Sequence, residues 1–301
     1  MPEISVVGGT IHYEKLGRGI PVVLTPGGRW AGYVQRVVAT ELAGDFQVIL
    51  WDRRNTDGKS SIAVRGARSE ADLWADDLAR LIQSLGLGPC YVGEYAGCRT
   101  TPLLCLKYPK LVKGLMLAWP SGGAVPAEGV PRVMYRPYIR AALRLGMAGV
   151  VKTAGAFTDS IKKNRANRER LLAMKPGQFI RQMAYWEAFF HTSADLPIAG
   201  CRATEEQWAS IKVPAIVTGG CDPIHPTAVA RRLHRLLPNS RYHAPVVTAK
   251  EWSKIFEVQP YPVVSNLQGK RIAPVWRSFL KQVEAEGGIG GSGGVPAQRS
   301  S

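Results

Sequence analysis

Short apolar segments alternate with amphipathic segments along most of the chain, and this alternation constrains the fold more than any other feature. The apolar runs predicted to be strands are 20–25, 46–51, 90–92, 112–119, 215–219 and 240–247. Helical spacing separates them; in the clearest case Ser69 is the predicted N-cap and Gly86 ends the helix. Strands joined by helices form mostly parallel sheets with helices on both faces. The sequence therefore predicts an α/β fold.

Two segments depart from this alternation. Residues 121–211 have a helical, basic pattern with no strand signal, and they predict an insertion between two parts of the core, 1–120 and 212–285. Residues 286–301 contain GGIGGSGG and predict a flexible tail.

The composition excludes several classes of protein. The 301 residues are 46% hydrophobic and 21% charged, which excludes a disordered chain, a collagen-like fibre and a coiled coil. No apolar run approaches the roughly 20 residues that span a bilayer, and the first residues lack the pattern of a signal peptide. The five cysteines show no CxxC spacing, so we expect a reducing, cytoplasmic compartment, no disulfide framework, no metal and no cofactor.

The formal charge of +16 is concentrated in the predicted insertion. Between Arg132 and Arg181, twelve basic and two acidic residues leave a surplus of ten positive charges. Such a field attracts anions, although a solvated basic face has the same composition. Because no nucleic-acid reader motif is present, we expect a small-molecule substrate, with an anionic one as an option, and no nucleic-acid partner.

Four motifs occur in a characteristic order. They are VVLTPGG, VILWDRRNTDGKSS, YVGEYAGCRTTPLLCLKYPKLVKGLMLAW and VPAIVTGGCDPIHP. In this order they resemble the oxyanion loop, the strand-then-Asp-Arg segment, the nucleophile elbow with the next strand, and the acid loop of the α/β-hydrolase family. The resemblance covers roughly residues 1 to 285. It implies a mostly parallel eight-stranded sheet flanked by helices, with 121–211 as a helical cap over the catalytic face.

The elbow motif departs from the family at one position. Gly93 and Gly97 stand two residues either side of Tyr95, where the family places a Ser, Cys or Asp nucleophile on a sharp turn. A phenol with a pKa of about 10 is mostly protonated at pH 7, so tyrosine is a rare covalent nucleophile. Three roles stay open for Tyr95: hydrogen-bond donor or proton shuttle, covalent nucleophile, or pocket filling. Pro102 predicts a kink in the helix that follows.

The acid position is retained and the histidine position is not. Asp222 follows the strand at 215–219, and the resemblance implies that its carboxylate orients a histidine. Residues 248–270, the expected histidine loop, contain no histidine. His225 is a candidate acid/base group or a loop residue at a helix start. Glu251 is a candidate general base or hydrogen-bond anchor, or a surface glutamate.

The resemblance also implies an oxyanion hole. Its expected donors are the backbone N–H groups of Ala96 and of the loop formed by Gly27, Gly28 and Arg29. Such a hole can bind a carbonyl, an enolate or a carboxylate without a serine beside it.

The predicted cap and the mouth of the site supply substrate-binding candidates. Arg54 adds a cation near the expected mouth, and Tyr135, Trp186 and Phe190 add aromatic rings from the cap. These rings alternatively form the core of the cap. An apolar pocket with a basic lip favours a hydrophobic organic acid or an acylated anion.

Three functions remain open from the sequence. The first is a hydrolase- or lyase-type enzyme acting on a small hydrophobic carbonyl compound or ester without a serine nucleophile. The second is a non-catalytic small-molecule binder that has lost the triad, and the third is a basic adaptor for an acidic partner. The missing serine and histidine favour the binder, whereas Asp222 and the elbow glycines favour the enzyme.

Overall fold

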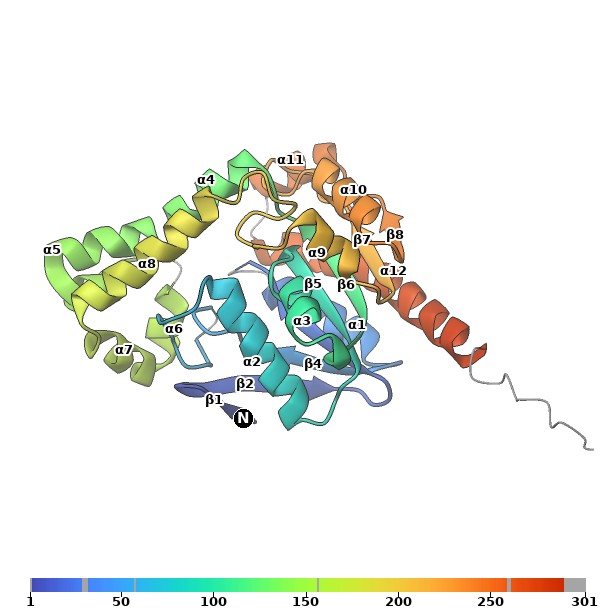
Figure 1. Ribbon diagram of the computed structural model, residues 1–301, viewed down its shortest axis with the longest axis horizontal. Helices are drawn as coiled ribbons and strands as arrows, with labels where there is room; N and C mark the ends of the chain where they lie inside the picture. The colour runs from blue at the N-terminus through green and yellow to red at the C-terminus, as the bar shows by residue number, and fades with distance from the viewer. Residues whose placement is uncertain (1, 29–31, 57, 156, 259–260, 290–301) are drawn as a thin grey trace, which may run out of the picture.

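The computed structural model describes residues 2–28, 32–56, 58–155, 157–258 and 261–289 (Figure 1). Within these residues eight strands form one sheet in the order β1-β2-β4-β3-β5-β6-β7-β8. The strands are β1 (Glu3–Val6), β2 (Gly9–Leu16), β3 (Pro21–Pro26), β4 (Gln47–Trp51), β5 (Cys90–Gly97), β6 (Val112–Pro120), β7 (Ala215–Thr218) and β8 (Ser240–His243). β2 pairs antiparallel with both β1 and β4, and the six strands from β4 to β8 in the sheet order, β3 included, are parallel to one another.

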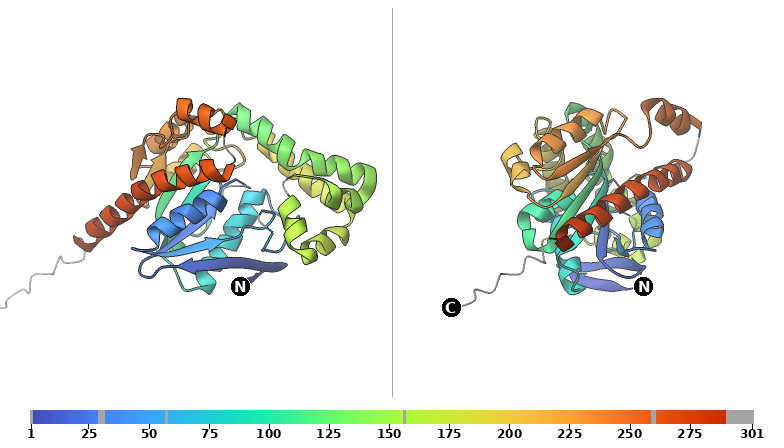
Figure 2. Two further views of the ribbon diagram at one scale, coloured as in Figure 1. Left: turned by 180° about the vertical axis from the view of Figure 1, so that it is seen from behind. Right: turned by 90° about the vertical axis from the view of Figure 1, so that its right-hand side faces the viewer.

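Helices cover both faces of the sheet, as predicted. One face carries α2 (Glu70–Ser84), α3 (Thr100–Lys107), α9 (Glu205–Ser210) and α10 (Thr227–Leu236), and the 3-10 helix Pro109–Leu111 follows α3. The other face carries α1 (Gly32–Leu42) and α12 (Tyr261–Ile289), which lie side by side (Figure 2). A separate apolar core fills each interface. The predicted α/β architecture is therefore confirmed.

A group of helices lies between β6 and β7. They are α4 (Ala124–Met134), α5 (Arg136–Lys152), α6 (Thr158–Lys163), α7 (Arg165–Leu172) and α8 (Pro176–His191). Their buried side chains, together with Ile62 and Val64, form a third apolar cluster. Figure 1 shows α4, α5 and α8 extending away from the sheet at one end of the molecule. We call this group the helical insertion.

The turn from β5 into α3 lies later than the sequence predicts. Tyr95 stays extended within β5 and pairs with both β3 and β6. Positive φ angles occur instead at Ala96 (64°), Gly97 (102°) and Cys98 (55°). The expectation that Tyr95 itself occupies the sharp bend is therefore wrong. Alanine and glycine adopt the left-handed region at lower steric cost than a bulky ring, so the bend falls where side chains are small.

Glu94 explains where α3 begins. Its buried carboxylate accepts hydrogen bonds from the backbone N–H groups of Arg99, Thr100 and Thr101 at 2.7–3.1 Å. These amides would otherwise lack partners at the start of the helix. Pro102 consequently lies in the first turn of α3, where its missing N–H removes no helical hydrogen bond. The predicted kink assumed an earlier helix start and is wrong.

The C-terminal part of the chain is more helical than expected. The segment predicted to be a loop from 248 to 270 contains α11 (Ala249–Val258) and the beginning of α12. α12 continues to Ile289, beyond the expected start of the tail at 286, and residues 290–301 lie outside the described residues. Of the described helices, none is both long and apolar enough to cross a membrane.

Candidate active site

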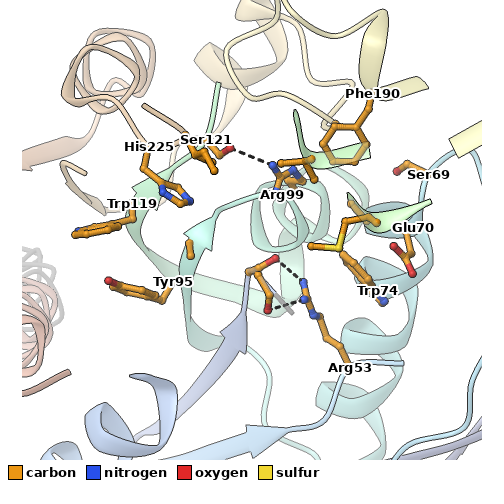
Figure 3. Close-up of a pocket in the computed structure, with 18 of the residues that line it drawn as sticks. Arg53, Ser69, Glu70, Trp74, Tyr95, Arg99, Trp119, Ser121, Phe190 and His225 are labelled. Carbon is orange, nitrogen blue, oxygen red and sulfur yellow. Dashed lines mark hydrogen bonds between the residues drawn. The ribbon is translucent and has the colours of Figure 1, made fainter. Parts of the chain in front are cut away.

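A cavity of about 590 Å³ lies where the carboxyl ends of β3, β5, β6 and β7 meet the helical insertion (Figure 3). Its lining is mainly apolar and aromatic, with a few charged side chains. In open α/β sheets, ligands bind outside the carboxyl ends of the strands. The cavity therefore stands where this fold class binds small molecules, and its size suits one.

Asp222 and His225 are in direct contact on the cavity wall. His225 Nδ1 lies 3.1 Å from Asp222 Oδ1 and 3.0 Å from Asp222 Oδ2. The same carboxylate accepts the backbone N–H groups of Ile224 and His225 at 2.9 and 3.0 Å. Burial alone would raise the pKa of the Asp222 carboxyl, but these hydrogen bonds outweigh it and hold that pKa below its usual value. The pair thus has one imidazole nitrogen fixed on a carboxylate, which leaves Nε2 for proton transfer.

Tyr95 lines the cavity within a cluster of aromatic rings. Its ring stacks on Trp119 with centroids 5.8 Å apart, and Trp119 lies 5.6 Å from His225 and 4.8 Å from Trp252. Trp119, the last residue but one of β6, has a φ of 57°, which is an outlier for a bulky residue. Tyr95 is 1% exposed, so its ring fills the floor of the cavity beside the Asp222–His225 pair.

The loop after β3 approaches β5 very closely. A Cβ at Gly27 would lie 1.7 Å from the carbonyl oxygen of Ala96, so only glycine fits there. The Gly27 N–H donates to the carbonyl oxygen of Tyr95 at 2.7 Å, which removes it from the predicted set of oxyanion donors. Gly28 and Ala96 line the cavity, and Arg29 lies outside the described residues.

Two of the described arginines, Arg53 and Arg99, line the cavity. Arg53 donates to the carbonyl oxygens of Gly27 and Gly28 at 3.1 and 3.2 Å and stacks on Trp74, so it fixes the shape of the loop. Arg99 donates to Ser121 Oγ at 3.1 Å and stands over the Phe190 ring, 5.0 Å from its centroid. Both side chains are buried, and both are drawn in Figure 3.

The helical insertion supplies the aromatic wall that the sequence predicts. Tyr135, Trp186 and Phe190 all line the cavity, and the Tyr135 ring lies 6.0–6.2 Å from the other two. The Tyr135 hydroxyl donates to Glu70 at 3.1 Å, which holds the ring in place. The same three rings also belong to the apolar core of the insertion, so the two alternatives left open by the sequence coincide.

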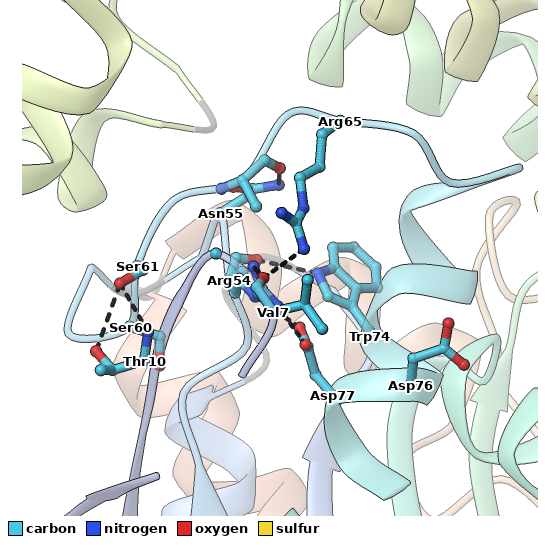
Figure 4. Close-up of polar contacts among 12 residues, drawn as sticks. Val7, Thr10, Arg54, Asn55, Ser60, Ser61, Arg65, Trp74, Asp76 and Asp77 are labelled. Carbon is cyan, nitrogen blue, oxygen red and sulfur yellow. Dashed lines mark hydrogen bonds and ion pairs between the residues drawn. The ribbon is translucent and has the colours of Figure 1, made fainter. Parts of the chain in front are cut away.

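The structure places Arg54 outside the cavity. Its guanidinium binds the Asp77 carboxylate, donating from Nε at 2.8 Å and also from Nη2, and it donates to the carbonyl oxygen of Val7 at 3.0 Å (Figure 4). The expectation of a cation at the mouth came from chain position alone, whereas a partner on α2 holds the side chain elsewhere. Burial raises the pKa of Asp77 although Arg54 opposes this shift.

Glu251 is also absent from the cavity wall. Its carboxylate accepts the Thr248 N–H at 2.9 Å at the start of α11 and forms an ion pair with Arg271 at 3.1 Å. Hydrogen bonds from Thr248 and Arg271 lower the pKa of Glu251 below its usual value. The segment expected to carry the catalytic loop is helical, so Glu251 caps a helix.

The serines that line the cavity are hydrogen-bonded to other groups, and the nearby Cys221 remains a thiol. Ser69 caps α2 and donates to Asp72 at 2.8 Å, and Ser121 accepts a hydrogen bond from Arg99. Burial, with the nearby Asp222 carboxylate, raises the pKa of Cys221 to about 11, which keeps it a thiol at neutral pH. Among the described residues, no group of three or more His, Cys, Asp or Glu side chains could hold a metal ion.

Several cavity residues were not identified from the sequence. Trp119 lies at the carboxyl end of β6 and Ser121 follows that strand directly, so the rule that ligands bind at the carboxyl ends of strands could have found both. Arg99 lies within the elbow motif, whose resemblance to the family points to a nucleophile and not to a cation. Trp252 depends on the position of α11, which was expected to be a loop.

Comparison with known proteins agrees with this architecture. No protein-family model matches the chain. The chain is 28% identical over 164 residues to the uncharacterized hydrolase YraK of Bacillus subtilis (strain 168); this match covers 54% of the chain and 52% of that protein. The chain thus matches about half the length of that curated relative.

Solved structures match over nearly the full chain. An esterase from Thermogutta terrifontis is 19% identical with a TM-score of 0.62, covering 94% of this chain and 99% of that one. A meta-cleavage product hydrolase from Pseudomonas fluorescens is 17% identical with a TM-score of 0.60, covering 94% and 98%. An enol-lactonase from Burkholderia xenovorans is 18% identical with a TM-score of 0.58, covering 93% and 100%. Together with the sheet order, these likenesses identify the chain as an α/β-hydrolase-fold protein.

Proposed function

We propose that this chain is an enzyme that hydrolyses a small hydrophobic ester, lactone or other carbonyl compound, using water rather than a serine as the nucleophile. The observation that carries the proposal is the contact between His225 Nδ1 and the Asp222 carboxylate, at 3.0 Å, on the wall of the cavity. The hydrolase-fold neighbours support the class of reaction. A soluble, cytoplasmic enzyme with a small-molecule substrate fits this proposal.

The Asp222–His225 pair supplies the base. His225 Nε2 takes a proton from a water molecule as the water oxygen adds to the substrate carbonyl, and Asp222 stabilises the resulting imidazolium through Nδ1. The tetrahedral intermediate then expels the leaving group, which receives the proton from His225. The imidazole therefore returns to its neutral form, and one water is consumed in each turnover.

The cavity around this pair positions the carbonyl. The backbone N–H groups of Ala96 and Gly28 are the proposed donors to the developing oxyanion, since both residues line the cavity. The rings of Trp186 and Phe190 face the same space and would bind the apolar part of the substrate. For Tyr95 we propose a role in packing or in hydrogen bonding to substrate, and not covalent attack.

Steady-state kinetics on a panel of short- and medium-chain aryl esters and lactones tests the proposal. His225→Asn and Asp222→Asn should each lower kcat/KM by roughly 10²-fold or more. His234→Asn, the same change on α10 outside the cavity, is the matched control and should retain full activity. Unchanged turnover in His225→Asn would refute the role of the pair.

A fluorophosphonate probe tests the absence of a serine nucleophile. The wild-type protein should remain unlabelled while it turns over substrate, with no burst of an acyl-enzyme. Stoichiometric labelling at Ser69 or Ser121, which are the serines among the described residues of the cavity lining, would overturn the water mechanism. Tyr95→Phe should retain most of the activity if the ring acts by packing, and loss of activity with normal folding would assign the hydroxyl a direct role.

A non-catalytic binder is the second candidate. The hydroxyl groups of Ser69 and Ser121 both serve in other hydrogen bonds, and this observation favours it. A binder would retain ligands in the cavity and show no turnover on any ester or lactone of the panel, whereas the enzyme would lose turnover only in the Asp222 and His225 variants.

A further inference from the structure

The Arg99 guanidinium is a buried positive charge at an apolar cavity. The side chain is 7% exposed, lines the cavity, and stands over the Phe190 ring. Burial lowers the pKa of Arg99 from its ordinary value, yet an arginine remains protonated in proteins. A buried charge is costly unless other groups compensate for it.

The contacts of Arg99 fix its position without neutralising it. Nε donates to the carbonyl oxygen of Ala199 at 2.6 Å, and Nη2 donates to Ser121 Oγ at 3.1 Å. Nη1 lies so close to Gly97 that a Cβ there would come within 2.2 Å of it. Among the described residues, no carboxylate oxygen lies within 4 Å of this guanidinium, whereas Arg54 has Asp77.

The nearby acidic groups are committed to other donors. Glu94 acts on Arg99 electrostatically, but its oxygens accept the amides at the start of α3. Glu70 accepts from Asn55 and Tyr135, and Asp222 holds His225. The cavity therefore contains a preorganised cation without a carboxylate of its own.

Ser121 adds a second donor at the same place. Because its oxygen accepts from Arg99, its hydroxyl proton is directed elsewhere. Ser121 follows Trp119 by two residues, and the Trp119 ring lies 5.6 Å from the His225 ring. The cation and the proposed base thus line the same cavity, and both are labelled in Figure 3.

We propose that Arg99 and the Ser121 hydroxyl form a carboxylate subsite, and that the substrate is a hydrophobic carbonyl compound bearing a carboxylate. This inference rests on the proposed function only in that it calls the ligand a substrate. The subsite itself concerns binding, which can be measured without turnover. A guanidinium binds a carboxylate through charge-assisted hydrogen bonds with fixed geometry, which a neutral amide of the same shape cannot reproduce.

Paired ligands test the subsite without turnover. Phenylacetate, 4-phenylbutyrate and octanoate are each compared with the corresponding primary amide by calorimetric titration of the full-length protein at pH 7.5. For at least one pair, the wild-type protein should bind the acid roughly 10-fold more tightly than the amide. If no acid binds more tightly than its amide, the proposal is wrong.

Single substitutions test which side chains cause the preference for the acid over the amide. Arg99→Gln should reduce the acid-to-amide ratio to within about 2-fold, and Arg99→Lys should retain part of it because a point charge remains. Ser121→Ala should weaken acid binding and leave amide binding unchanged. Arg140→Gln, on the exposed face of α5, removes the same charge outside the cavity and should keep the full ratio.

Two outcomes separate this inference from its basis. If circular dichroism shows that Arg99→Gln is unfolded, the acid-to-amide affinity ratios of Arg99→Lys and Ser121→Ala replace it as the test. Ratios equal to that of the wild type in both variants would refute the subsite. His225→Asn should keep the acid preference, because the subsite does not use the proposed base. A chain without hydrolytic activity that still prefers acids would refute the proposed function alone.

Discussion

Replacing Glu94 with glutamine should destabilise the protein strongly, although the two side chains have nearly the same shape. One carboxylate oxygen accepts from the N–H groups of Arg99 and Thr100 at 2.9 and 3.1 Å. The other accepts from the N–H of Thr100 and from the N–H and hydroxyl of Thr101 at 2.7–3.0 Å. All of these partners are donors, and Glu94 is fully buried.

The magnitude follows from what a glutamine amide can satisfy. In the better orientation its oxygen keeps the contacts to Thr100 and Thr101, and its NH₂ group faces the Arg99 N–H. An unsatisfied buried donor costs about 1–3 kcal/mol. Loss of the negative charge at the start of α3 removes up to about 2 kcal/mol of interaction with the helix dipole. We therefore expect a loss of about 2–4 kcal/mol in the free energy of unfolding.

Urea denaturation followed by tryptophan fluorescence measures this loss. The midpoint should fall by about 0.7–2 M if the urea m-value lies near 2–3 kcal/mol per molar. Glu128→Gln, an exposed glutamate on α4, is the matched control and should leave the midpoint unchanged. A Glu94→Gln midpoint within error of the wild type would show that the carboxylate does not hold the start of α3.

Three further perturbations test other parts of the structure. Gly97→Ala forces a side chain onto a φ of +102° and against Arg99, so the unfolding free energy should fall by about 1–3 kcal/mol, while Gly44→Ala, in open space, should not lower it. Asp222→Asn should destabilise the protein at pH 7 by about 1 kcal/mol. Because the folded pKa of this carboxyl is depressed, the difference from wild type should shrink as pH falls below about 3.8, and a difference independent of pH between 7 and 3 would contradict it. Asp77→Asn should cost about 3–5 kcal/mol in urea unfolding without altering ligand affinity in the cavity, and a changed affinity would contradict the position assigned to Arg54.

The alternation of strands and helices could be predicted because it depends on local spacing alone. The bounds of the strands predicted at 46–51 and 112–119 agree within one residue with those of β4 and β6. Elements whose ends depend on distant contacts could not be placed as well. The start of α3 depends on a Glu94 carboxylate that caps it from within the preceding strand, and no pattern of apolar spacing records such a contact.

The candidate site residues show the same difference between local and distant contacts. His225 follows Asp222 by three residues, so a local turn was enough to place it at the rim, and the structure brings the two side chains together. Arg54 and Glu251 were assigned from their positions in family motifs. Their partners, Asp77 and Arg271, are 23 and 20 residues away along the chain, and only the folded structure shows those pairs.

Residues with strained backbone angles lie at the same edge of the sheet as the proposed active site. Ala96, Cys98 and Trp119 have positive φ angles where β5 and β6 end, and each such residue costs about 1–3 kcal/mol. Glycine at these positions would remove most of that cost. The Trp119 side chain contacts Tyr95 and His225, so its strained position shapes the cavity wall. A surface that served packing alone would have no need of this strain, and its location therefore favours a cavity that binds a ligand in a defined orientation.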